Sequence, residues 1–63
     1  MNSAIDILRQ YGRPTEREES VLNEVLGRLG QGEIEGHEAI DLLIDRLDWP
    51  LERAAAEVDA FLE

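Results

Sequence analysis

Apolar residues recur at intervals of three and four along this chain, in four short stretches separated by glycine or proline. This spacing places apolar side chains on one face of an α-helix. No stretch alternates apolar and polar residues in the way that is typical of a half-buried strand. The pattern therefore predicts an all-α fold: a small compact bundle of three main helices plus a short N-terminal helix, forming one helical domain over residues 1–63.

The first two helices have clear start and stop signals. The short N-terminal helix covers residues 3–11, with Ser3 as its cap and Gly12 as its stop. In the second helix, Thr15 and Glu18 form the Thr-x-x-Glu pattern of a capping box, and Gly30 ends the helix. We expect the buried stripe of this second helix to contain Val21, Leu22, Val25, Leu26 and Leu29.

The third and fourth helices are amphipathic in different ways. The third follows the turn at residues 30–33, and its expected buried face is Ile40, Leu43, Ile44 and Leu47, with Glu38, Asp41, Asp45 and Asp48 on the opposite face. The fourth begins at residues 48–50, with Asp48 or Trp49 as its cap. We expect this helix to have one apolar face, which contains Leu51, Ala54, Ala55, Val58, Phe61 and Leu62. Ala56 and Ala60 form a small outer face, which is either neutral surface or a docking strip for another helix.

Size and composition exclude several classes of protein. A domain of 63 residues buries only about 60% of its unfolded surface, and without cysteine it has neither disulfides nor thiolate metal sites. No apolar run approaches the ~20 residues that span a bilayer, and no signal peptide is visible. We therefore expect a cytoplasmic protein that does not enter membranes.

Catalytic and metal chemistry are not expected either. The chain has only two serines, one threonine and one histidine, and four short helices leave no room for a sheltered cleft of ~300 Å³. Asp41, Asp45 and Asp48 are close together but lack the loop that calcium requires. His37 has no second histidine or any cysteine beside it. The sequence thus predicts a protein that is not an enzyme, with no cofactor and no metal site.

The stretch from Gly32 to Ile40 reads Gly-Glu-Ile-Glu-Gly-His-Glu-Ala-Ile and joins two amphipathic helices. It resembles the helical hairpin of short C-terminal domain modules, and it is similar to the small antitoxins that inhibit Fic-type AMP-transferases. The resemblance covers residues 21–47. Those antitoxins carry a Ser/Thr-x-x-x-Glu-Gly/Asn motif. The most similar segment here is residues 15–20, in which Ser20 stands where the motif has Gly or Asn. The resemblance implies a helical regulator of a partner enzyme.

Charge gives the leading functional prediction. Fifteen acidic residues face six arginines and no lysine, so the net charge is -9. Nucleic acid and anionic membranes would repel such a surface, whereas a basic protein surface would attract it. In size and charge the chain resembles small acidic phage inhibitors, including anti-CRISPR and anti-restriction proteins that mimic DNA. We expect it to inhibit a nucleic-acid-handling protein through a surface that contains Glu38, Asp41, Leu42, Asp45, Asp48, Trp49 and Glu52.

Two residues of that surface have a second interpretation, and the function has two alternatives. Leu42 either packs against the first helix or serves as an exposed apolar anchor, and Trp49 either closes the core or serves as the anchor. The first alternative function is an antitoxin or regulator that folds against a partner enzyme through apolar helix faces. The second is a homo-oligomerisation module, for example a homodimer, in which acidity serves only solubility.

Overall fold

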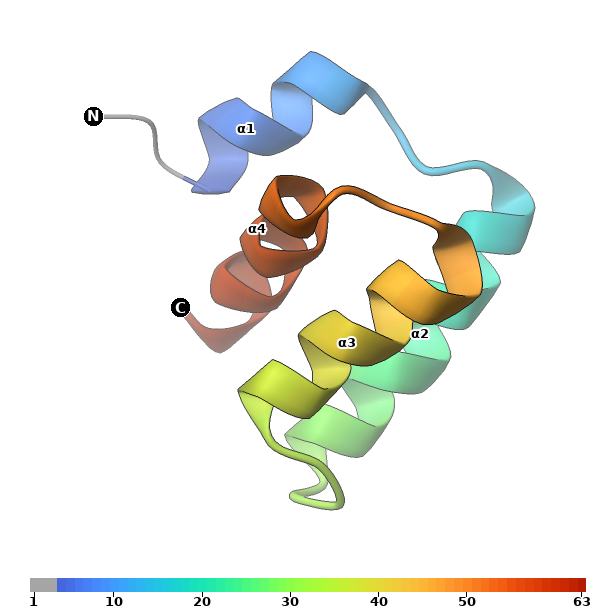
Figure 1. The fold of residues 1–63 in the computed structure, drawn as a ribbon. Helices are drawn as coiled ribbons and strands as arrows, with labels where there is room; N and C mark the ends of the chain where they lie inside the picture. The colour runs from blue at the N-terminus through green and yellow to red at the C-terminus, as the bar shows by residue number, and fades with distance from the viewer. Residues whose placement is uncertain (1–3) are drawn as a thin grey trace.

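The computed structural model describes residues 4–63 of the chain and contains four helices (Figure 1). They are α1 (Ala4–Tyr11), α2 (Glu16–Gly30), α3 (Gly36–Leu47) and α4 (Leu51–Leu62), with no strand among the described residues. α2 packs against α3, α3 packs against α4, and α1 lies along α4. The predicted all-α bundle is confirmed, whereas the expected cap at Ser3 lies outside the described residues.

The ends of α2 follow the local sequence signals. Glu18 N–H donates to Thr15 Oγ1 at 3.2 Å, and Thr15 N–H donates to Glu18 Oε1 at 2.8 Å, so the predicted capping box is present. Two residues beyond the C-terminal Gly30, Gly32 adopts a φ of 79°, which favours glycine because it has no Cβ. The chain thereby turns back sharply into α3.

The turn between α3 and α4 differs from the prediction. Asp48 ends α3 in the left-handed conformation, with a φ of 56°, and its N–H donates to the Ile44 carbonyl at 2.9 Å. Pro50 then occupies the N-cap position of α4, without a side-chain hydrogen bond. The expectation that Asp48 or Trp49 caps α4 is therefore wrong. Aspartate tolerates the left-handed region better than most residues, which suits Asp48 to this corner.

The core lies where α2, α3 and α4 meet. Its buried residues are Leu22, Val25, Ala39, Leu43, Trp49, Ala54 and Val58. On α3 the fully buried positions are Ala39 and Leu43, whereas Ile40, Ile44 and Leu47 are only half-buried. The expected stripe was therefore centred too far toward Ile44. α3 packs against α2 on one side and α4 on the other, and this pair of contacts moves the centre of its buried face to Ala39 and Leu43.

The fourth helix is buried on two opposite sides rather than on one. Ala54 and Val58 belong to the core, while Ala56 is buried (2% exposed) outside that cluster, on the side where α1 packs. Of the two interpretations of the small face at Ala56, docking of another helix agrees with the structure, because α1 packs on this side of α4. Conversely, Leu51 and Leu62 were expected in the core but remain 64% and 61% exposed.

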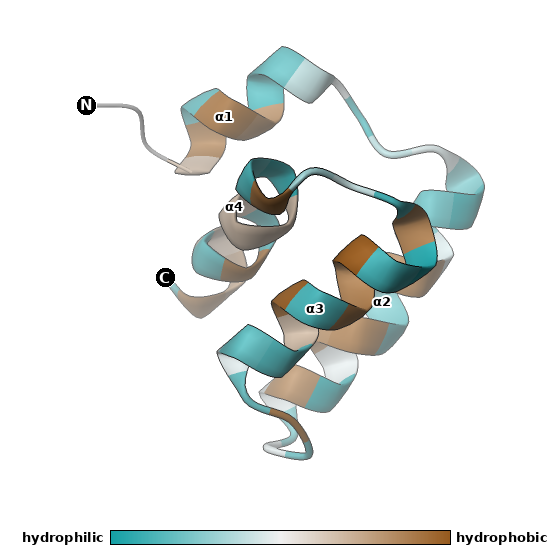
Figure 2. Ribbon diagram, in the orientation of Figure 1, coloured by the Kyte–Doolittle hydropathy of each residue, from teal (hydrophilic) through white to brown (hydrophobic). Residues whose placement is uncertain are grey.

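Hydrophilic segments interrupt the hydrophobic ones along every helix (Figure 2). No helix in residues 4–63 is both long enough and apolar enough to cross a membrane.

Candidate protein-binding surface

The outer side of α3 carries uncompensated negative charge. Asp41 and Asp45 on α3, and Asp48 just beyond it, are all exposed, and none of them takes part in the ion pairs found within residues 4–63. Arg46 is the one arginine of α3, and its Nη1 lies 3.3 Å from Glu24 Oε2 on α2. The positive charge of α3 is therefore directed toward α2, and we call Asp41, Asp45 and Asp48 the α3 acidic face.

The other two acidic residues predicted for this surface also have structural contacts. Glu38 Oε1 accepts a hydrogen bond from Glu35 N–H at 3.1 Å, which helps to cap α3. Glu52 Oε2 accepts a hydrogen bond from the Tyr11 hydroxyl at 3.3 Å and so connects α4 to the end of α1. Glu38 and Glu52 are both exposed. Glu38 adjoins the α3 acidic face on the same helix, whereas Glu52 belongs to α4, and both side chains also stabilise the fold.

Trp49 is a core residue and does not serve as an exposed anchor. It is only 4% exposed, and its Nε1 donates to Glu18 Oε2 at 2.7 Å. The hydrogen bonds from the Thr15 backbone and from the Trp49 indole hold the pKa of the Glu18 carboxyl below its usual range. Trp49 is therefore removed from the predicted binding surface, and its alternative interpretation, closure of the core, is correct.

Arg53 completes this junction, and no sequence signal pointed to it. Its guanidinium lies over the Trp49 ring, 4.0 Å from the centroid, and 5.3 Å from the centroid of the Tyr11 ring. Its Nη1 is 3.7 Å from Glu18 Oε2. Cation–π and ionic contacts of one side chain thus connect α1, α2 and α4. These partners are distant in sequence, so periodicity and motif spacing contain no trace of them.

Leu42 is half-buried and packs against the core cluster. Four residues further along α3, Arg46 reaches Glu24 of α2, so this side of α3 faces α2. The interpretation that Leu42 packs against the first helix is therefore wrong, because α1 packs along α4 and Leu42 faces α2. Because it faces α2, Leu42 is not the exposed anchor of the predicted surface.

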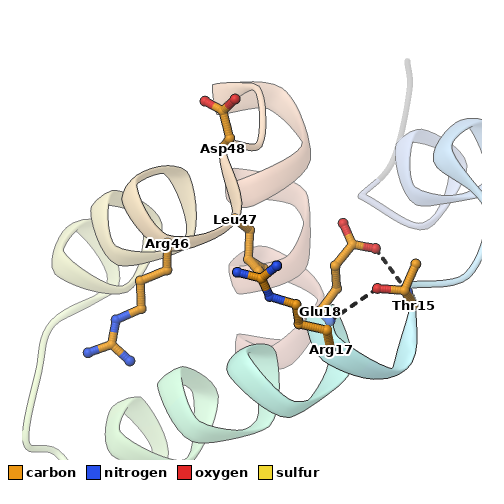
Figure 3. A pocket seen from close by; sticks show the side chains of 6 residues that line it. All are labelled: Thr15, Arg17, Glu18, Arg46, Leu47 and Asp48. Atoms are coloured by element: carbon orange, nitrogen blue, oxygen red, sulfur yellow. Dashed lines mark hydrogen bonds between the residues drawn. The ribbon is translucent and has the colours of Figure 1, made fainter.

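Two pockets open on the surface. The first, of about 420 Å³, is lined by Thr15, Arg17, Glu18, Arg46, Leu47 and Asp48 (Figure 3). The second, of about 400 Å³, lies against α1 and α4 and includes Ile5, Leu8, Pro14 and Glu57. Both are open to solvent, so neither is a sheltered cleft of the kind considered in the sequence analysis. Burial raises the pKa of the Glu57 carboxyl, against the opposing effect of Arg53.

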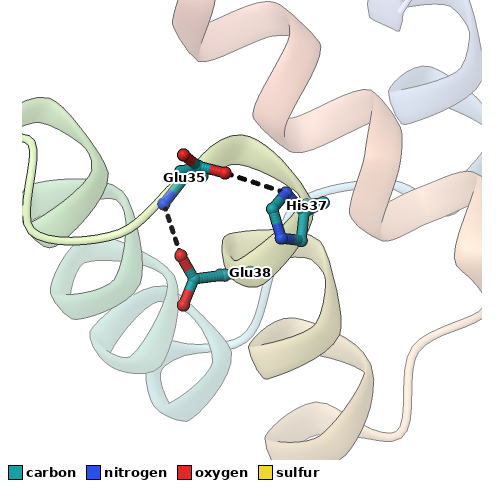
Figure 4. Close-up of side chains that lie close together, drawn as sticks. All are labelled: Glu35, His37 and Glu38. Atoms are coloured by element: carbon teal, nitrogen blue, oxygen red, sulfur yellow. Dashed lines mark hydrogen bonds and ion pairs between the residues drawn. The ribbon is translucent and has the colours of Figure 1, made fainter.

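Glu35, His37 and Glu38 form a small cluster at the start of α3 (Figure 4). Their ligand atoms lie within 4.8 Å of one another, and His37 Nδ1 is 3.4 Å from Glu35 Oε2. All three residues are exposed, and the Glu38 carboxylate already caps the helix. This proximity follows from their places in one helical turn.

No protein-family model matches the chain, and no curated protein or solved structure is significantly similar to it.

Proposed function

We propose that this chain binds another protein through the α3 acidic face and inhibits it by occupying the basic surface on which that protein holds nucleic acid. One observation carries the proposal. Asp41, Asp45 and Asp48 are exposed and form no ion pair with any residue from 4 to 63, while Arg46 is turned toward Glu24 on the far side of α3. The face therefore offers carboxylates to arginine and lysine side chains of a partner without first breaking internal ion pairs.

The spacing of these carboxylates favours the same interpretation. Neighbouring positions on one helix face lie about 5–6 Å apart, so the face presents regularly repeated negative charges, as a nucleic-acid strand does. The net charge of -9 repels nucleic acid itself and attracts basic surfaces. The expected partner is therefore a protein that binds nucleic acid through such a surface. Such association is fast and sensitive to salt and requires no catalytic group, and the cytoplasm is the proposed site of action.

Charge reversal on α3 tests the proposal. The variant Asp41→Lys/Asp45→Lys and the control Glu19→Lys/Glu33→Lys both change the net charge from -9 to -5, since each removes two negative and adds two positive charges. The control positions are also exposed but lie on α2 and in the α2–α3 turn. Each protein is immobilised, incubated with host lysate at low salt, and eluted with duplex DNA or with high salt.

We expect the wild type and the control to retain nucleic-acid-binding proteins that DNA displaces, and the α3 variant to lose them. Equal losses with both variants would contradict a defined binding face. A partner that resists high salt, ignores DNA and binds the α3 variant would contradict the proposal and favour the antitoxin or regulator function.

A further inference from the structure

Apolar side chains gather on the outer edge of α4. Leu51 and Leu62, at 64% and 61%, are the most exposed large apolar residues described. At 100° per residue, Leu51, Ala55 and Leu62 fall within about 40° of one another around the helix axis. They therefore form one line along α4, on a side that neither the core nor α1 covers.

The neighbouring edge of α3 continues this apolar surface. A Cβ placed on Gly36 would lie 3.9 Å from Leu62 Cδ1, so the start of α3 adjoins the end of α4. Ile40 and Ile44 follow Gly36 by one and two turns on the same side of α3, and both are half-buried. We call these five residues the α3–α4 strip: Ile40, Ile44, Leu51, Ala55 and Leu62.

The strip lies on the side of the α3–α4 pair that faces away from α2. Two contacts mark the side that faces α2: Arg46 reaches Glu24, and the Phe61 ring lies 3.2 Å from a Cβ placed on Gly30. Going around each helix axis from the side that faces α2, one meets first the α3–α4 contact and then the residues of the strip. No described helix therefore covers the strip.

Acidic residues border the strip on both helices. Helix geometry puts Glu52 and Asp59 beside it on α4, and Asp41 and Asp48 beside it on the α3 side. The three arginines with known ion pairs are directed elsewhere, Arg28 and Arg46 to Glu24 and Arg53 to Glu18. An apolar line between two negative margins complements a helix that has one apolar face flanked by lysine or arginine.

We propose that the α3–α4 strip binds a basic amphipathic helix of the partner protein. This inference rests on the proposed function and identifies the element of the partner that is recognised. A second copy of the chain is a poor occupant, since two chains of charge -9 repel one another. Exposed ion pairs alone contribute little affinity, whereas buried leucines contribute much more. The strip thus supplies the apolar anchor that neither Leu42 nor Trp49 provides, in a helix-in-groove arrangement.

A synthetic helix serves as the probe. It is a labelled peptide of about 18 residues, or five turns, with leucine at positions i, i+3, i+4 and i+7 and lysine elsewhere. A scrambled peptide of the same composition has no apolar face. Binding to the full chain is measured by fluorescence anisotropy and mapped by NMR chemical shifts. The test variant is Leu51→Gln/Leu62→Gln, and the control is Ile5→Gln, a single substitution of the same kind at a residue of α1 that is 52% exposed.

We expect the patterned peptide to bind the wild type and Ile5→Gln with similar affinity, and the strip variant at least about tenfold more weakly. Shift changes should be centred on residues of the α3–α4 strip. Circular dichroism checks that the variants keep their helices, and the wild-type shift map tests the site without any substitution.

Three results would overturn the inference. They are equal binding of both peptides, unchanged affinity of the strip variant with shift changes elsewhere, and a wild-type dimer in sedimentation that the strip variant abolishes. The first two would leave the proposed function intact, because that function is tested by displacement with DNA and by the Asp41→Lys/Asp45→Lys variant.

Discussion

At the scale of single residues, Glu18 has the largest structural role of any acidic side chain described. One carboxylate oxygen accepts the Thr15 N–H and thereby caps α2, while the other accepts the Trp49 indole N–H and so fixes the turn before α4. Arg53 lies 3.7 Å from the second oxygen. Hydrogen bonds to a charged acceptor are stronger than neutral ones, and they account for the lowered pKa of Glu18.

Replacing this carboxylate should destabilise the fold. We expect Glu18→Gln to lower the free energy of unfolding at pH 7 by about 1–2 kcal/mol, because an amide accepts through one oxygen only and carries no charge. Glu19→Gln, at the exposed neighbouring position, should change it by less than about 0.5 kcal/mol. Urea unfolding followed by the fluorescence of Trp49, the single tryptophan, measures both variants.

The stability difference between the wild type and Glu18→Gln should depend on pH, and the sign of this dependence follows from the pKa of Glu18. Because folding lowers the pKa of Glu18, its stabilisation is complete above the usual value of 4.5 and is lost as pH falls through the lowered value. The difference in stability between wild type and Glu18→Gln should therefore shrink as pH falls below 4.5. A difference that stays constant down to low pH would contradict a role for the carboxylate charge.

Glu57 should show the opposite sign. Burial raises the pKa of its carboxyl, so the charged form destabilises the fold at pH 7, and this penalty disappears as pH falls below the usual value of 4.5. We expect Glu57→Gln to raise the free energy of unfolding at pH 7 by less than about 0.5 kcal/mol, and to have no such effect in acid. Chemical denaturation of both proteins at pH 7 and at a pH below 4.5 measures these changes in the free energy of unfolding. A loss of stability of Glu57→Gln at pH 7 would show that the attraction between Glu57 and Arg53 dominates.

At the scale of helices, sequence signals worked where the determinants were local. The ends of α2 were predictable because Thr15, Glu18 and Gly30 act within a few residues of one another. The burial of α4 was not, since Ala56 is covered by α1, which is distant in sequence, while Leu51 and Leu62 follow the helical pattern but receive no partner. The burial of Trp49 under Arg53 depends on three helices meeting, which no periodicity encodes.

The packing of α1 leads to a prediction about its dynamics. α1 contains no buried residue and depends on α4, with the contacts of Tyr11 to Glu52 and Arg53 at its end. Since eight residues form a marginal helix in isolation, α1 should open without unfolding the rest. We expect its amides to exchange with solvent deuterium at least about a hundredfold faster than those around Leu43, measured by NMR. Equal protection would mean that α1 unfolds only together with the core.

At the scale of the whole molecule, the net charge could be read from the sequence, but the shape of the proposed binding surface could not. The acidic residues of α3 could be assigned to one face from the helical period alone. The apolar strip beside them could not, because the same period predicted Leu51 and Leu62 for the core. Only the arrangement of α3 and α4 relative to α2 shows which apolar residues remain exposed.

The net charge also sets how stability responds to salt. The molecule measures 30 × 25 × 15 Å, so at about 10 mM salt, where the screening length is about 30 Å, every charge interacts with every other. At about 150 mM the length falls to about 8 Å, and only neighbouring charges still repel. The midpoint of thermal unfolding should therefore rise as salt increases from about 10 mM to about 150 mM.

The variant Asp41→Asn/Asp45→Asn reduces the net charge from -9 to -7. It should therefore be more stable than the wild type at low salt and respond less to added salt. A midpoint that falls with salt would mean that the ion pairs of Glu24 and Glu18 outweigh the repulsion, and the acidic face would then be no burden on the fold.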